Sequence, residues 1–215
     1  MNLKDYITQR SDTFIQRLER EAGTISLDVD EWGWENYLYT SPKFRQAHIE
    51  RYFHPHLMVF HITVFPHKNN THPMFGFDLI GYPRKGVIGA AFLDWSPTYG
   101  NIDWKPPVFN QPYNLPDWTA GIFSDRFVAC VPQKDEYEKL IENAYSMFNR
   151  TLLNLDNNDW KTEDDLVIKQ IVEKQNDYCE RQWQNERTFG ALKSKVGEER
   201  AKYFMQNILF PKIND

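Results

Sequence analysis

The 215-residue chain has only two cysteines and no long apolar segment. Cys130 and Cys179 do not form a CxxC pair, which argues against a disulfide framework or a cysteine-rich metal site. No stretch approaches the roughly 20 apolar residues that a membrane helix needs, and the N-terminus lacks the apolar segment of a secretory signal. We therefore expect a cytoplasmic protein that does not bind or cross a membrane.

Basic residues are also scarce, since 25 Lys and Arg stand against 30 Asp and Glu and give a net charge of −5. A nucleic-acid binder needs a basic face to neutralise phosphates, so the composition argues against nucleic acid as a partner. The chain has no Gly-rich nucleotide loop, which argues against direct use of a nicotinamide cofactor. A partner that docks by charge would have to use a local patch.

Aromatic residues, in contrast, are plentiful: seven Trp, eleven Tyr and fifteen Phe. Most rings of such a set are expected in the core, where aromatic pairs stabilise neighbouring strands. As a set they also suit a pocket for a flat conjugated ligand.

The apolar pattern changes twice along the chain. It has a helical period over residues 4–22, gives way to short β-rich runs between Trp32 and Pro97, and becomes helical again beyond Lys134. The expected strands cover 34–40, 44–53, 57–65, 74–82, 86–95 and 126–132, and further helices are expected at 162–184 and 198–209. Helix, antiparallel meander and helices without βαβ alternation predict one α+β domain over residues 1–215. Its expected architecture is a three-layer α/β/α sandwich whose central antiparallel sheet is flanked by helices.

All six histidines lie between positions 48 and 72. The two-residue period of a strand places His48 and Glu50 on one face, and it leaves His61 and Asp78 as single polar groups among apolar neighbours. Such groups are costly to bury unless they contact each other or a ligand. A satisfied core residue would explain each one alone, but the set favours a functional site.

A metal site is the less favoured interpretation of these histidines. His54, His56, His67 and His72 flank turn residues and are expected to face solvent, and the chain has neither HExxH nor CxxC. An acid/base site, in which a histidine and a carboxyl group share protons in an apolar cavity, needs only the residues that are present. A metal-dependent hydrolase that uses the histidines stays open as an alternative.

Six segments then suggest a family. "FRQAHIE", "HITVFP", "HPMFGFDLIG", "LDWSPT", "LPDWTAGIFSDRF" and "ERTFGALKSKVGEERAKYFMQNILF" follow one another between residues 44 and 210. In this order the chain resembles the ferredoxin-dependent bilin reductases, and most closely the phycocyanobilin:ferredoxin oxidoreductase branch and its phage-encoded phycoerythrobilin-forming relatives. The resemblance implies an antiparallel sheet between helices and reduction of biliverdin IXα through bilin radicals, without a metal or bound cofactor. Reduced ferredoxin would supply the electrons.

The resemblance also implies roles for residues of the sheet. Asp78 of "FGFD" matches the family's catalytic aspartate, and His61 of "HITVFP" matches its partner histidine, which could resupply the proton. His48 and Glu50 of "HIE" match the histidine and glutamate associated with the D-ring vinyl group.

Further roles follow for the C-terminal block. Asn185, Glu186 and Arg187 match a polar triplet beside the substrate, in which Arg187 would pair with a propionate. Glu186 stands where related branches carry a second catalytic aspartate. Tyr113 replaces a propionate-binding arginine of the family, which changes how the bilin carboxylates are anchored at that end.

The sequence leaves open the identity of the bilin product and the surface that binds ferredoxin. The retained His48, Glu50 and His61 suggest phycocyanobilin, whereas a short N-terminus and a divergent second half slightly favour phycoerythrobilin; a carrier that binds a bilin or haem without reducing it is the alternative class. We expect a monomer that binds acidic ferredoxin through a local basic patch. The candidate patch consists of Lys193, Lys195, Arg200 and Lys202, which could equally be an ordinary solvated helix face.

Overall fold

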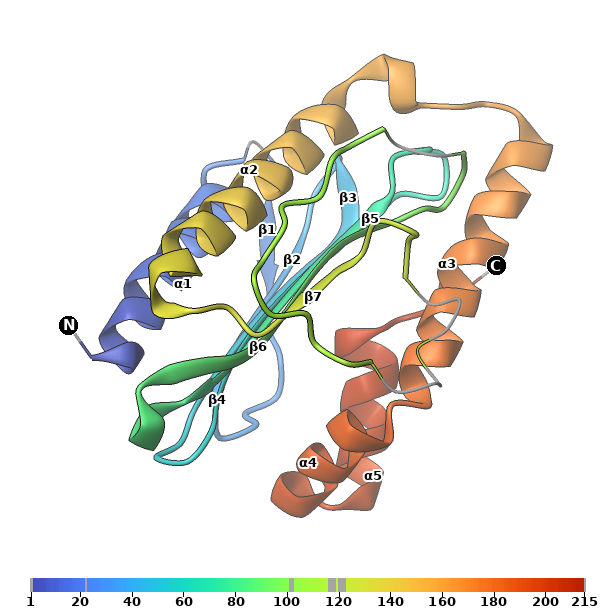
Figure 1. Ribbon diagram of the computed structural model, residues 1–215. Helices are drawn as coiled ribbons and strands as arrows, with labels where there is room; N and C mark the ends of the chain where they lie inside the picture. Colours follow the sequence, from blue (N-terminus) through green and yellow to red (C-terminus); the bar gives the residue numbers. More distant parts are fainter. Residues whose placement is uncertain (1, 22, 101–102, 116–118, 120–122, 215) are drawn as a thin grey trace.

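The computed structural model describes residues 2–21, 23–100, 103–115, 119 and 123–214. Most of the segment "PDWTAGI" in the family-like pattern therefore lies outside the described residues. In the described part, seven antiparallel strands form one sheet, and they lie side by side in the order of the sequence (Figure 1). The strands are β1 (Ile25–Leu27), β2 (Glu35–Thr40), β3 (Phe44–Phe53), β4 (Met58–Pro66), β5 (Met74–Tyr82), β6 (Val87–Ser96) and β7 (Val128–Cys130).

This topology confirms the predicted meander and adds the short edge strand β1. All three residues of β1 are exposed, so the strand lacks the alternation of buried and exposed positions from which a strand is predicted. β7 is shorter than expected, because the ladder to β6 covers only its three residues.

The helices are α1 (Leu3–Glu19), α2 (Tyr137–Asp156), α3 (Asp165–Trp183), α4 (Glu186–Val196) and α5 (Glu198–Tyr203), which continues as a π-helix over Phe204–Leu209. Short 3₁₀ turns cover Pro83–Lys85, Lys134–Glu136 and Asn158–Trp160. The sequence did not predict α4. Its apolar stripe is short, with Leu192 buried and only Phe189 and Val196 half-buried against the same core.

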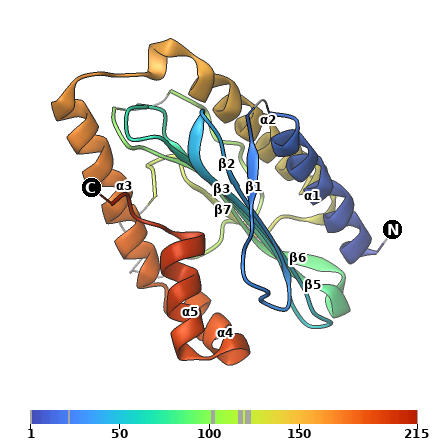
Figure 2. The same cartoon turned by 180° about the vertical axis from the view of Figure 1, so that it is seen from behind.

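The helices cover both faces of the sheet (Figures 1 and 2). α1 and α2 lie on one face and α3, α4 and α5 on the other, which confirms the predicted three-layer α/β/α sandwich. The core under α1 and α2 is aromatic: the ring of Phe14 lies 5.4 Å from that of Phe60 on β4 and 5.2 Å from that of Phe148 on α2. A second core beneath the C-terminal helices includes Phe204 and Phe210.

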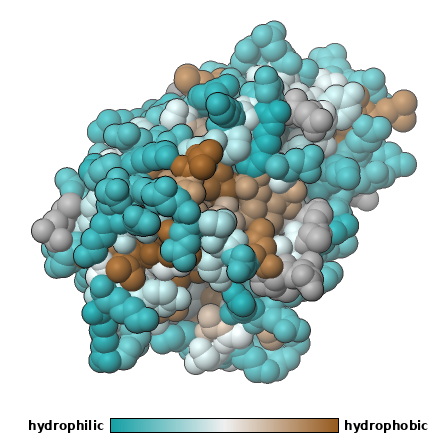
Figure 3. Space-filling view, viewed as in Figure 1, coloured by the Kyte–Doolittle hydropathy of each residue, from teal (hydrophilic) through white to brown (hydrophobic). Residues whose placement is uncertain are grey.

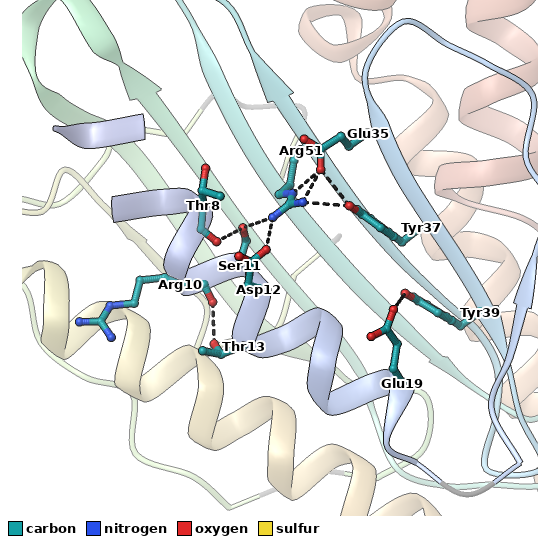
Figure 4. A network of polar contacts seen from close by, with 10 residues as sticks. All are labelled: Thr8, Arg10, Ser11, Asp12, Thr13, Glu19, Glu35, Tyr37, Tyr39 and Arg51. Atoms are coloured by element: carbon teal, nitrogen blue, oxygen red, sulfur yellow. Dashed lines mark hydrogen bonds and ion pairs between the residues drawn. The ribbon is translucent and has the colours of Figure 1, made fainter. Parts of the chain in front are cut away.

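A buried arginine attaches α1 to the sheet (Figure 4). Arg51 on β3 donates from Nε to Glu35 at 2.8 Å and from Nη2 to the Tyr37 hydroxyl at 2.9 Å, and it forms an ion pair with Asp12 on α1. Only 9 % of its side chain is exposed, so the acidic partners offset the cost of burying the charge. Because adjacent strand residues point to opposite faces, this anchor leaves Glu50 on the face of the C-terminal helices.

Candidate active site

One row of side chains crosses the sheet on the face toward the C-terminal helices. Asn36 on β2 pairs with Glu50 on β3, Glu50 with His61 on β4, His61 with Asp78 on β5, and Asp78 with Phe92 on β6. Directly opposed residues of antiparallel strands point to the same face. The meander thus brings three of the predicted catalytic residues into line.

The centre of the row is an imidazole–carboxylate pair. His61 Nδ1 lies 2.6 Å from Asp78 Oδ1, the length of a strong charge-assisted hydrogen bond. His48 lies one pleat away, opposite Thr63, and its ring centroid is 5.7 Å from that of His61. The two histidines therefore belong to one buried cluster with Glu50.

These groups hold protons with different strengths. Burial raises the pKa of Glu50 to about 7, while the nearby His61 charge lowers it. Burial alone would lower the pKa of His61, but attraction to the Asp78 carboxylate and the hydrogen bond to it outweigh burial and raise the pKa. Burial holds the pKa of His48 well below its usual range, and His61 adds to that effect. Near neutral pH the cluster thus holds a neutral His48 and a Glu50 close to its midpoint, and the raised pKa of His61 keeps its proton bound to higher pH than on a free imidazole.

Asp78 differs from the others in its exposure. Its side chain is 40 % exposed and that of His61 only 8 %, so the expectation that apolar neighbours surround both was wrong for Asp78. The space comes from Gly76, which lies on the same face two residues earlier; a Cβ there would meet no atom within 4 Å. Asp78 is the member of the pair that a ligand on this face can reach.

Aromatic rings continue the site beyond Asp78. Phe123 stacks on Phe127 at 3.9 Å, and Phe127 is parallel to Phe92 at 6.1 Å. These three half-buried residues form an aromatic ladder, and the Tyr113 ring lies edge-on to Phe92 at 5.2 Å. Apolar surface gathers in the middle of the face seen in Figure 1, where β6, β7 and the loop before β7 run (Figure 3).

The C-terminal triplet lies at the start of α4. Asn185 is the N-cap, and its Oδ1 accepts a hydrogen bond from the backbone N–H of Thr188 at 3.1 Å. Glu186 is exposed in the first turn. Arg187 donates from Nη1 to the Tyr113 hydroxyl at 3.0 Å, and the Tyr113 ring contacts Phe92, the residue opposite Asp78 on β6. Asn185 and Arg187 therefore each make a hydrogen bond within the protein.

Comparison with known proteins identifies the family. The model of the ferredoxin-dependent bilin reductases matches residues 15–211. The chain belongs to this family. A phycocyanobilin:ferredoxin oxidoreductase from Synechococcus elongatus is 30 % identical over 229 residues, covering all of this chain and 88 % of the relative. The same enzyme from Trichodesmium erythraeum is 28 % identical and 87 % covered.

Solved structures support the fold. A structure of a protein called PcyX matches with a TM-score of 0.68 and 22 % identity, over 97 % of this chain and 99 % of the other. Phytochromobilin synthase from tomato in complex with biliverdin matches with a TM-score of 0.70 and 16 % identity, over 96 % and 82 %. The predicted family and enzyme class are thus confirmed: the chain is a ferredoxin-dependent bilin oxidoreductase. The roles of its individual site residues stay predictions.

Not every histidine of this bilin reductase lies where its sequence context indicates. His54 and His56 are exposed as expected and His67 is half-buried, but His72 is fully buried. The ring of Trp160 covers His72 at a centroid distance of 4.9 Å, and burial lowers its pKa to about 4. The prediction for His72 was wrong because the covering ring comes from a 3₁₀ turn far along the chain.

The described residues offer no arrangement for a resident metal. Among them, no three His, Cys, Asp or Glu side chains come together to hold an ion. The same residues include no helix that is long and apolar enough to span a membrane.

Sequence reasoning missed several residues of the candidate site. Asn36 closes the row on β2, where its Oδ1 lies 3.1 Å from His48 Nε2. Phe204 covers His48 at 6.0 Å and Phe210 covers His61 at 6.2 Å, both edge-on. Alternation along β2 places Asn36 and Leu38 on one face, which was the available signal, but only the register shows that this face meets His48.

Proposed function

We propose that this chain reduces biliverdin IXα by four electrons to a phycobilin, without a bound cofactor. Reduced ferredoxin supplies single electrons, and each bilin radical takes up a proton from the protein. The observation that carries the proposal is the His61–Asp78 pair at 2.6 Å, which ends at a half-exposed carboxyl group beside open space. Four electrons and four protons balance the reduction of two double bonds.

Asp78 and His61 have different roles in the first proton transfer. Asp78 is the reachable member of the pair, so it contacts the bilin and passes on the proton that it shares with His61. His61 is buried behind it, and its raised pKa keeps a proton on the ring from which the carboxyl group is resupplied. Reprotonation then requires no rearrangement of the pair.

Glu50 and His48 serve the other reduction, at the D-ring vinyl group. A carboxyl group whose pKa is about 7 is protonated in a large fraction of molecules at neutral pH and can still release the proton. Glu50 lies directly opposite His61, and His61 lies opposite Asp78, so the two proposed donors, Glu50 and Asp78, are on the same face. His48 supports this end of the site as a neutral imidazole.

Recognition of the bilin combines flat stacking with charge. The aromatic ladder offers planar apolar surface next to Asp78, which suits a conjugated tetrapyrrole. Arg187 pairs with a propionate, and the Tyr113 hydroxyl holds its guanidinium. The Asn185 Nδ2 group and Glu186 complete the polar edge near the start of α4.

We favour phycoerythrobilin slightly over phycocyanobilin as the product, because the chain departs from the phycocyanobilin branch in its second half, as at Tyr113. The enzyme acts as a cytoplasmic monomer. Ferredoxin docking by charge would rest on the predicted basic patch, but Lys193 and Lys202 both form ion pairs with Glu198, at 2.7 and 2.9 Å. Lys195 and Arg200 are then its main attractive charges.

The test is an anaerobic absorbance time course with biliverdin IXα, reduced ferredoxin and a regenerating system, followed by chromatography of the extracted pigment. We expect transient radical absorbance and a four-electron product, whose identity decides between the two phycobilins. A spectral shift on binding without turnover would overturn the reductase proposal in favour of a bilin or haem carrier.

A further inference from the structure

Asn36 has a side-chain amide whose orientation is fixed by the backbone. Its Nδ2 donates to the carbonyl oxygen of Trp34 at 3.2 Å. A carbonyl oxygen only accepts hydrogen bonds, so the NH₂ end of the amide must face Trp34. The Oδ1 end must therefore point the other way, toward β3.

That oxygen determines which nitrogen of His48 carries a proton. Asn36 Oδ1 lies 3.1 Å from His48 Nε2, and an amide oxygen can only accept. A hydrogen bond at this distance requires an Nε2–H on the imidazole. The alternative tautomer would set two lone pairs against each other in a fully buried position.

The second nitrogen of His48 follows from the first. The ring is completely buried among β2, β3 and Phe204, and it is neutral at physiological pH, so it carries a single proton. With that proton on Nε2, Nδ1 is a bare acceptor. Nδ1 is itself buried and has no hydrogen-bond partner among the described residues.

We infer that Asn36 is a positioning residue that holds His48 as its Nε2–H tautomer and leaves Nδ1 as a proton acceptor. The tautomer of an imidazole is set by the hydrogen bond at its other nitrogen, and here the Trp34 carbonyl sets the amide that makes this bond. In its neutral form, His48 can then accept a proton at Nδ1 but has no proton at Nδ1 to donate. The catalytic consequence of this rests on the proposed function, whereas the tautomer does not.

The tautomer is measured directly by NMR of protein labelled with ¹⁵N in histidine, using long-range ¹H–¹⁵N correlations. A His48→Gln variant identifies the signals of His48. We expect wild type to show a protonated Nε2 and an unprotonated Nδ1 on His48. In Asn36→Leu, which keeps the branched shape of the side chain but removes the acceptor, we expect a mixture of tautomers or the Nδ1–H form. The same substitution at Asn143, a half-buried residue whose side chain donates to the Lys139 carbonyl within α2, is the matched control and should leave the signals unchanged.

A second variant separates positioning from folding. Asn36→Asp retains an acceptor for Nε2–H, so it should keep the tautomer while its negative charge raises the pKa of His48. Asn36→Leu should lower kcat on the order of tenfold or more with little change in KM for biliverdin, since a wrong tautomer impairs proton transfer more than binding. Asn36→Asp should recover part of this loss.

Two results would overturn the inference: an Nδ1–H tautomer of His48 in wild type, or a pure Nε2–H tautomer in a folded Asn36→Leu variant. Should Asn36→Leu fail to fold, the wild-type spectrum and Asn36→Asp still decide the question. If wild type forms no reduced bilin while the NMR result is as expected, the proposed function fails and the positioning role of Asn36 stands.

Discussion

Replacing Glu50 with Gln should stabilise the protein above neutral pH and impair catalysis at the same time. Gln has nearly the same shape as Glu and carries no charge, so it removes the cost of ionising a carboxyl group that is only 9 % exposed. Burial raises the pKa of Glu50 from 4.5 to about 7. A difference of about 2.5 pH units corresponds to about 3 kcal/mol of stability at 1.36 kcal/mol per unit.

The sign follows from proton binding. Between pH 4.5 and 7 the folded protein holds a proton on Glu50 that the unfolded chain has released, so this contribution is complete below pH 4.5 and is lost as pH rises through 7. Relative to Glu50→Gln, wild type should therefore lose about 3 kcal/mol of unfolding free energy between pH 4.5 and 8. His48 and His61 titrate in both proteins, and they largely cancel in the comparison.

The assay is urea unfolding of both proteins at closely spaced pH values, with the free energy in water obtained by linear extrapolation. Glu19→Gln, a change at a carboxyl group on α1 that accepts a bond from Tyr39, provides a control on the other face of the sheet. A stability difference between wild type and Glu50→Gln that does not change with pH would refute the assignment of a high proton affinity to Glu50. Full activity of Glu50→Gln would separately refute its role as a proton donor.

Four further predictions concern other parts of the molecule. Asp78→Asn should still bind biliverdin but reduce it at a rate lower by roughly 100-fold or more, as loss of a general acid does; an unchanged rate in single-turnover absorbance would contradict the proton-donor role. Neutral His72 contributes stability above pH 6.5 that is lost as pH falls through about 4. In urea unfolding, wild type should therefore lose about 3 kcal/mol more than His72→Gln between pH 7 and 4. A difference in unfolding free energy that stays constant with pH would contradict the lowered pKa of His72. Tyr113→Phe removes the hydroxyl that holds Arg187 and should weaken biliverdin binding about two- to fivefold, with no effect on the dimethyl ester of biliverdin; equal losses for both ligands would exclude a carboxylate contact. Added salt should slow reduction by ferredoxin without weakening biliverdin binding if a charged patch steers docking, as stopped-flow traces would reveal.

The layers of the fold could be predicted because most β-strands and most helices carry a clear apolar pattern. The strand that contains His61 is a good example: its nearly continuous apolar run, bounded by turn residues, predicts a strand, and the two-residue period places His61 and Thr63 on one face. Where the period is weak, prediction fails. α4 has only the short stripe of Phe189, Leu192 and Val196, and β1 buries none of its residues, so neither carries a strong apolar period.

The active-site row was only partly predictable, because a two-residue period specifies faces and not register. It could place His48 with Glu50 on one strand, but pairing of Glu50 with His61 depends on the register of the β3–β4 hairpin. Asn36 shows the limit clearly. The two-residue period along β2 shows only which face of the strand Asn36 occupies. The pairing of Asn36 with Glu50 is what places its amide beside His48.

The two faces of the sheet have different roles: one carries contacts that hold the strands, and the other carries titratable groups in fixed positions. On one face β3 is held by Arg51, whose ion pairs with Asp12 and Glu35 connect it to α1 and β2. On the other face the next residue, Glu50, lies in the row with His61. Because interiors are close-packed, the aromatic core under α1 and α2 limits movement of the strands, and the registers of the strands then set the separations between the proton-carrying side chains. The same rigidity allows Asp78 to remain half-exposed, since its position depends on the sheet and not on a cover of neighbouring side chains. A bilin on the open side would thus meet a donor whose location was determined before it bound, and a substitution at Arg51 should disturb the reductase site without contacting it.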